Sequence, residues 1–173
     1  MKYMTMGFTL VEQLACLAVL GVLSAIALPG LRQFMQAQQV TGATHALHAS
    51  LLLARSEAVK RNRPVLVDNG DGDWASGWRV YADLNDNGRL DAGEPLIRVT
   101  ARLSGEVVAR GNAPVRRHVR YVGNGRSQLA GGAFQAGTIS ICHASARQPV
   151  RRLVVNAGGR PRLVSDPPGS CAD

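Results

Sequence analysis

The sequence predicts an α+β protein, in which one long N-terminal helix packs on an antiparallel β-rich head. Three observations predict it. An almost uninterrupted apolar run occupies residues 8–31, apolar residues then recur at helical spacing as far as Ala58, and short β-type runs follow Pro64. A chain of 173 residues has room for one domain of ordinary size and one appended element.

The apolar run is long enough to cross a membrane. Its 24 residues, from Phe8 to Leu31, would form a helix about 36 Å long, against a hydrocarbon core of about 30 Å. Glu12 is its only charged residue, and a carboxylate in such a segment is costly unless it has a partner. A cleaved signal peptide is the alternative, but the run is longer than the usual apolar core, and the only leader charge is Lys2. We therefore predict a membrane-spanning helix.

Residues 32–62 are predicted to form an amphipathic continuation of this helix. The apolar residues that share one face at three- and four-residue steps are Phe34, Ala37, Val40, Ala43, Leu47, Leu51, Ala54 and Ala58. The helix should end at Asn62, because the residue before Pro64 disfavours helical geometry. We expect this half to pack on the head, with a kink near Pro29-Gly30 or at Gly42.

Residues 63–173 carry the signals of a β-rich globular head. The runs that we interpret as strands are 64–68, 77–82, 95–99, 106–109, 119–122, 138–142 and 153–156, and Gly, Asn and Asp separate them. They predict one or two antiparallel sheets that cover one face of the helix.

The segment from Gly7 to Glu12, GFTLVE, resembles the prepilin signature of type IV pilins and of the pseudopilins of type II secretion. The resemblance implies a leader of residues 1–7, which prepilin peptidase removes, and N-methylation of the new terminal residue, Phe8. In that family the fifth mature residue is a glutamate, which here is Glu12. Pro29 also falls where the family has a helix-bending proline. A type IV pilin-like fold is therefore expected.

The same resemblance gives Glu12 a partner. Cleavage would leave a free amine on Phe8, and in a stack of parallel helices the Glu12 carboxylate could pair with the amine of a neighbouring subunit. The expected partners are other pilins, contacted through the N-terminal helix. The expected location is the inner membrane, with one span and the head in the periplasm, and later the pilus at the cell surface.

The head resembles the FimT/GspH group of minor pilins. The residues that carry this likeness are the turn Asn69–Asp73, Trp74, Gly77-Trp78, the Asp/Asn/Gly hairpin after Ala82, and a late Gly-Arg-Pro-Arg near a cysteine. Two functions remain open. One is a minor type IV pilin that binds DNA in natural transformation, and the other is a GspH-like pseudopilin of type II secretion without DNA binding.

The charge distribution favours a polyanionic partner. The full chain carries a net charge of +8, and residues 101–173, with eleven arginines and three acidic residues, account for all of it. Arginine alone supplies the basic side chains there, which suits two-point contacts with phosphate. The alternative is a codon preference for arginine together with a solvated basic surface.

The segment Gly159–Arg162, GRPR, is the strongest candidate for DNA contact. In an extended chain, Arg160 and Arg162 project to one side about 6.6 Å apart, similar to neighbouring backbone phosphates. FimT-like pilins of competent bacteria carry a Gly-Arg-x-Arg element implicated in DNA binding. The resemblance assigns Gly159, Arg160 and Arg162 to this role, and the further candidates are Arg151, Arg152, Arg116, Arg117 and Arg120. Because few aromatic residues lie nearby, binding should be sequence-independent and salt-sensitive.

Cysteines and acidic residues suggest structural roles. Cys142 and Cys171 both fall in the exported head, an oxidising location, so a disulfide is predicted between them. Residues Asp83–Glu94 match the ligand spacing of a calcium loop, but strand-like flanks favour a polar hairpin turn, so we predict no metal site and leave calcium open.

No catalytic constellation stands out, so we expect neither an enzyme nor a cofactor.

Overall fold

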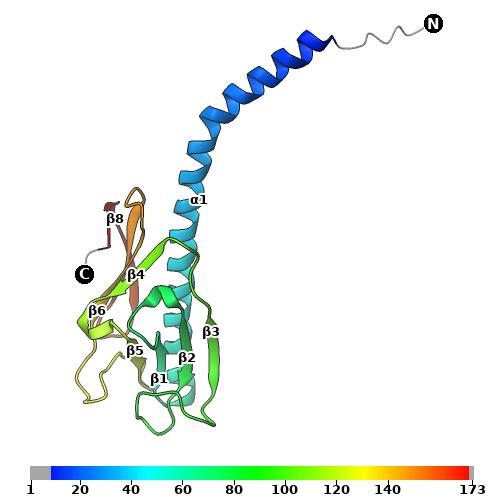
Figure 1. Cartoon of the computed structure of the whole chain (residues 1–173). Coiled ribbons are helices and arrows are strands. Elements are labelled where there is room, and N and C mark those ends of the chain that lie inside the picture. The colour runs from blue at the N-terminus through cyan, green and yellow to red at the C-terminus, as the bar shows by residue number, and fades with distance from the viewer. Residues whose placement is uncertain (1–8, 172–173) are drawn as a thin grey trace, which may run out of the picture. The chain divides into compact units, whose positions relative to one another are not determined.

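The computed structural model describes residues 9–171, which fall into two compact units on either side of the Met35–Gln36 bond. The predicted cleavage residues, Gly7 and Phe8, lie outside the described part. The helix α1, Leu10–Arg61, contributes to both units (Figure 1).

In the first unit, the side chains of α1 are exposed. A window of 18 residues has a mean hydropathy of 2.3, and none of it is buried within the protein. This helix is long and apolar enough to cross a membrane. The helix runs without interruption through Pro29.

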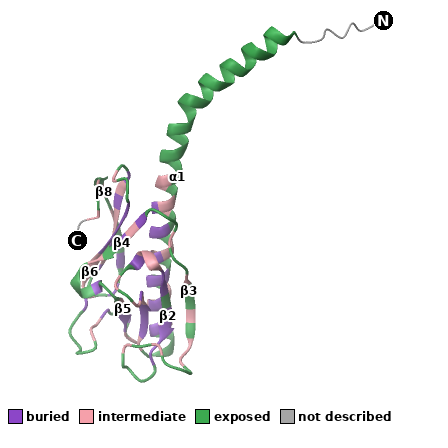
Figure 2. Ribbon diagram, viewed as in Figure 1, coloured by how far each residue is buried: buried purple, intermediate pink, exposed green. Residues whose placement is uncertain are grey.

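In the second unit, α1 buries one face, which begins at Val40 (Figure 2). The buried helix residues are Val40, Ala43, Thr44, Leu47, Ser50, Leu51, Ala54 and Ala58. The predicted stripe is therefore confirmed from Val40 on, but Phe34 is 60% exposed and does not belong to the core. The helix ends at Arg61, and Asn62 follows with a φ of 50°, a left-handed turn that asparagine tolerates.

The head contains two four-stranded antiparallel sheets, which lie side by side along α1 (Figure 1). The first sheet has the order β3-β2-β1-β5, and its strands are β1 Val65–Asp68, β2 Trp78–Ala82, β3 Leu96–Thr100 and β5 His118–Tyr121. The second has the order β4-β6-β7-β8, and its strands are β4 Val107–Gly111, β6 Gly137–His143, β7 Pro149–Val155 and β8 Pro161–Pro168. Two short 3-10 helices, η1 Trp74–Ser76 and η2 Ala113–Val115, connect strands.

All seven predicted strands are present, and two departures concern the C-terminal hairpin. β7 begins at Pro149, four residues earlier than predicted, and β8 was not predicted as a strand. The sequence pattern did not indicate a strand there because β8 contains three prolines, and proline lacks the N–H that an interior strand requires. β8 tolerates them because it is an edge strand.

The core connects the head half of α1 to both sheets. Trp78 Nε1 donates to Ser50 Oγ of α1 at 2.9 Å, and Trp74 Nε1 donates to the carbonyl of Val115 at 3.0 Å. Among the described residues, every buried one lies at Val40 or later. The head from Gln36 thus has a complete core of its own, and we expect it to fold as a separate fragment.

Candidate nucleic-acid interface

The turn between β7 and β8 is fixed by Asn156. Its carbonyl accepts from Gly159 N at 2.8 Å, and its Oδ1 accepts from Arg160 N at 3.1 Å. Ser127 Oγ also donates to the Asn156 carbonyl at 2.9 Å, which joins this turn to the loop after β5. The backbone that carries Arg160 is therefore held in one conformation.

Gly159 is required by this packing. It has a φ of 74°, it is buried, and a Cβ atom there would overlap the carbonyl oxygen of Gly125. The left-handed conformation alone disfavours other residues, and the contact leaves no room for a side chain. Gly159 is thus placed against the loop at Gly125 and is not open to a ligand, whereas Gly158 is exposed.

Arg160 and Arg162 are both exposed, and the buried Pro161 lies between them. This alternation is the one that an extended segment imposes, so the two guanidinium groups leave the same side of the chain. Neither side chain has a hydrogen-bond or ion-pair partner among residues 9–171. They line a groove of about 600 Å³ together with His48 of α1, Val154 of β7 and Leu163 of β8.

Arg151 and Arg152 differ from this pair. Arg152 is engaged by Asp166 of β8, with Nη2 donating to Oδ1 at 2.9 Å and Nε 2.6 Å from Oδ2. Arg151 is half-buried and pairs in register with Ser165. Because successive strand residues point to opposite faces, the two arginines do not act from one side.

The arginines around β5 do not join the hairpin. Arg120 is only 5% exposed and pairs with Asp86, while Arg117 Nη2 donates to the carbonyl of Gly70 at 2.7 Å. Both interactions belong to the first sheet and its loops. The sequence-based suggestion that Arg116, Arg117 and Arg120 extend the patch is therefore not supported by their positions.

Arg126 is the basic residue that sequence reasoning missed. Its backbone packs on the turn, since a Cβ on Gly159 would lie 3.2 Å from Arg126 Cα, and the residue is exposed. No local pattern places residues 123–127 beside a turn that begins 29 residues after Ser127, so only the fold reveals this neighbour.

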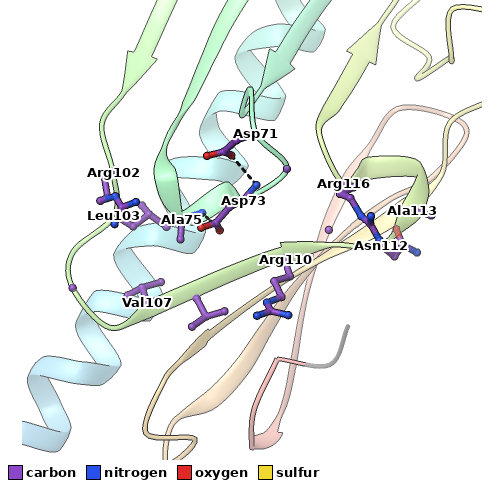
Figure 3. A pocket seen from close by; sticks show the side chains of 14 residues that line it. Asp71, Asp73, Ala75, Arg102, Leu103, Val107, Arg110, Asn112, Ala113 and Arg116 are labelled. Atoms are coloured by element: carbon purple, nitrogen blue, oxygen red, sulfur yellow. Dashed lines mark hydrogen bonds between the residues drawn. The ribbon is translucent and has the colours of Figure 1, made fainter.

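A larger pocket than this groove lies elsewhere, between the loop that leads into η1 and strand β4. It has a volume of about 940 Å³, and Arg102, Arg110 and Arg116 reach it from three segments (Figure 3). Two carboxylates share it. Asp71 accepts from Asp73 N at 2.9 Å, which lowers the pKa of Asp71, and Asp73 caps η1 through Ala75 N. The mixed charge makes this pocket a weaker polyanion site than the hairpin.

Glu12 forms a local interaction at the start of α1. Thr9 N donates to Glu12 Oε2 at 3.4 Å, and Glu12 N donates to Thr9 Oγ1 at 3.3 Å. This is a capping box, and the Thr-x-x-Glu spacing predicts it, although our sequence analysis did not use that signal. In the isolated chain, Glu12 therefore stabilises its own helix terminus.

The predicted disulfide is present between Cys142 and Cys171. It joins the segment after β8 to β6, and therefore restrains the strand that carries Arg162. Cys16 is free and exposed on α1.

The carboxylates of the loop Asp83–Glu94 are used within the loop. Asp83 accepts from the backbone of Asn87 and Gly88, at 3.1 and 2.7 Å. Side-chain amides of Asn85 and Asn87 bind Asp91 and lower its pKa. Within residues 9–171, no group of three or more His, Cys, Asp or Glu side chains is placed to hold a metal ion. The loop is a hairpin connection that its own polar side chains stabilise.

Comparisons with known proteins identify related chains. The family model of the type II transport protein GspH matches residues 43–159. The minor pilin FimU of Pseudomonas aeruginosa is 23% identical, and the match covers 78% of this chain and 92% of FimU with a TM-score of 0.58. The minor pseudopilin EpsH of Vibrio cholerae is 15% identical, with 73% and 97% covered and a TM-score of 0.54. No curated protein sequence matches significantly. The family match stops at Gly159, so Arg160 and Arg162 lie beyond it.

Proposed function

The chain belongs to the GspH family of minor pilins and pseudopilins, and from this premise we propose that it is a FimT-like minor type IV pilin that binds DNA during natural transformation. Members of this family are structural subunits, so the activity is assembly and binding. The DNA contact is the β7–β8 hairpin, and it recognises phosphate without regard to base sequence.

One observation carries the proposal: two exposed arginines, which have no partner among residues 9–171, extend from a rigid turn. A fixed backbone lowers the entropy lost when phosphate is bound, because only the side chains remain to be ordered. Separation by about two strand residues, roughly 6.6 Å, matches neighbouring phosphates of one strand. Each guanidinium can make charge-assisted, two-point hydrogen bonds to phosphate oxygens.

The neighbouring residues have supporting roles in this proposal. Gly159 sets the turn and the direction of Arg160, and does not touch DNA itself. Arg126 provides a third cation beside the turn. Arg151 and Arg152 lie at the edge of the DNA site, and Arg152 contributes only when its ion pair with Asp166 is broken.

The N-terminal segment serves processing and assembly. Prepilin peptidase cuts after Gly7, Phe8 becomes the methylated terminus, and the helix holds the subunit in the inner membrane, with its head in the periplasm, before it enters a pilus. Glu12 then exchanges its capping interaction for the amine of a neighbouring pilin. Mass spectrometry of the mature protein tests the cleavage site and the methyl group. A Glu12→Ala variant should be cleaved normally but be lost from sheared pili, and its normal recovery in them would contradict this role.

DNA binding is tested on the head from Gln36 with fluorescently labelled duplexes of unrelated sequence. The double variant Arg160→Gln and Arg162→Gln should bind at least about tenfold more weakly, since two phosphate contacts are lost. The matched control removes two exposed arginines of the first sheet and its loops, Arg98→Gln in β3 and Arg89→Gln in the loop before it, and should retain affinity within about twofold. Equal binding by all three proteins, or no binding at low salt, would refute the proposal.

The second candidate is a pseudopilin of type II secretion, which the GspH family match and the likeness to EpsH favour. Deletion of the gene separates the two. Loss of transformation with normal protein secretion supports the pilin, and loss of secretion with normal transformation supports the pseudopilin.

A further inference from the structure

The groove beside the hairpin contains a histidine of the long helix. His48 of α1 is half-buried and lines the groove with Arg160 and Arg162. Asn156 adds an amide, and the remaining lining residues are the apolar Val154, Pro161 and Leu163. Residues separated by more than 100 positions are thus brought to one site, which is built from a helix, a turn and an edge strand.

The charged residues that line the groove with His48 are two arginines. The turn between β7 and β8 contributes Asn156 and Arg160, β7 contributes Val154, and β8 contributes Arg162. No acidic side chain lines the groove within the described residues. Arginine keeps its charge throughout the accessible pH range, whereas an imidazole changes its charge between about pH 5 and 8. Within the described residues, His48 is the one ionisable side chain lining this groove that is not an arginine.

We propose that His48 is a proton-dependent phosphate contact of the DNA site, so that the head binds DNA more tightly as the pH falls. The inference builds on the proposed function, because it names a further contact residue of that same site and the condition that activates it. The protonated ring donates from both nitrogens, which adds a charge-assisted hydrogen bond to a phosphate oxygen that enters the groove. By linkage, a bound phosphate in turn favours the protonated ring.

The other histidines of the chain are compared with His48 to choose a control residue. His45 is exposed on the same helix one turn earlier, but it does not line the groove. Burial lowers the pKa of His118, and His143 is buried with its Nε2 3.3 Å from Glu106. His45 is therefore the matched control for a change of histidine charge on the surface of α1.

The experiment measures the affinity of the head from Gln36 for a labelled duplex at about pH 7.5 and pH 5.5 and constant ionic strength. Wild type and His45→Gln should bind about two- to fivefold more tightly at the lower pH. His48→Gln should bind like wild type at the higher pH and lose that gain. His48→Lys should bind tightly at both pH values, because its charge is permanent there.

The outcomes separate this inference from the proposed function. A wild-type head that binds DNA with the same pH response as His48→Gln overturns the role of His48 and leaves the arginine site intact. A pH response lost equally in His45→Gln also overturns it, because the effect is then general surface charge. A wild-type head that binds DNA at neither pH overturns both.

Discussion

The two sheets of the head use their charged residues in different ways. In the first sheet, Arg79 lies 3.6 Å from Asp68, Arg117 binds a backbone carbonyl, and the buried Arg120 pairs with Asp86. In the second sheet, Arg152 also pairs with Asp166, but Arg160 of the β7–β8 turn and Arg162 of β8 have no protein partner within the described residues. Charges that are neutralised internally stabilise a fold, whereas exposed charges on a fixed turn are available to a ligand.

The edge strands of the two sheets, β3 and β8, also differ in the residues they carry. β3 is an edge strand without proline, and Leu96 and Val99 are exposed on it. β8 is an edge strand with three prolines, and it also carries Arg162 and Asp166. Proline and charge on an edge prevent the addition of a foreign strand. At this edge the second sheet therefore presents side chains rather than backbone groups for a further strand.

The largest effect is expected from removal of the disulfide. A Cys142→Ser and Cys171→Ser head should lose about 3–4 kcal/mol of unfolding free energy, because the bridge closes a loop with a sequence separation of 29. Urea denaturation measures the change. If the second sheet depends on this restraint, the backbone amides of β8 should also exchange their hydrogens faster, and they should do so before the amides of the first sheet. An unchanged midpoint would show that the bridge is unimportant to the hairpin.

The next effect concerns the turn itself. Gly159→Ala should lower the unfolding free energy by about 1–3 kcal/mol, since it combines a left-handed φ with a backbone overlap. The control is Gly158→Ala, where the nearest heavy atom, Asn156 Oδ1, is 3.4 Å from the added Cβ, and it should change stability by less than about 0.5 kcal/mol. DNA affinity should fall only in the first variant. Equal behaviour of the two would contradict a fixed turn.

A smaller effect, of opposite sign, is expected at Asp166. Asp166→Asn releases Arg152, and DNA affinity should rise about two- to fivefold because one more cation becomes available. Asp68→Asn is the control in the first sheet. It frees Arg79 but should leave affinity unchanged, and a similar gain there would erase the distinction between the sheets.

The smallest effect is the response to acid, to which the loops of the first sheet should contribute. Asp71 and Asp91 have lowered pKa values, because a backbone N–H and side-chain amides, respectively, bind their carboxylates. A carboxyl whose pKa is lower in the folded state stabilises above its unfolded pKa, and this contribution is lost as the pH falls through the folded value. The head should thus lose stability below about pH 4. Asp71→Asn should lose less stability than wild type at low pH, as measured by thermal unfolding. An identical loss in the two proteins would contradict this.

The sequence allowed most of the fold to be predicted, because its signals were local. The helical stripe from Val40 to Ala58 and the seven strands follow from spacing and turn residues that lie next to one another in the chain. β8 was missed because its prolines contradict the usual strand pattern, and the fold overrides it at an edge. Phe34 was assigned to the core because periodicity does not reveal where the head begins.

The candidate site was predicted only in its contiguous part. Arg160 and Arg162 are two residues apart, so strand geometry alone places them on one side. His48 and Arg126 reach the same place through the packing of α1 and of Gly125 against Gly159, which no local pattern encodes. In the same way, the partner of Arg152 could not be inferred, because it depends on the register of β7 with β8.

The dependence of DNA affinity on salt concentration tests the central claim most directly, namely that Arg160 and Arg162 neutralise DNA phosphates. The logarithm of the binding constant falls linearly with the logarithm of salt concentration, with a slope of about 0.9 for each phosphate neutralised on duplex DNA. The Arg160→Gln, Arg162→Gln head should therefore show a slope smaller by about 1.8 than wild type, while the Arg89→Gln, Arg98→Gln control keeps the wild-type slope. Identical slopes for wild type and the hairpin variant would contradict the account.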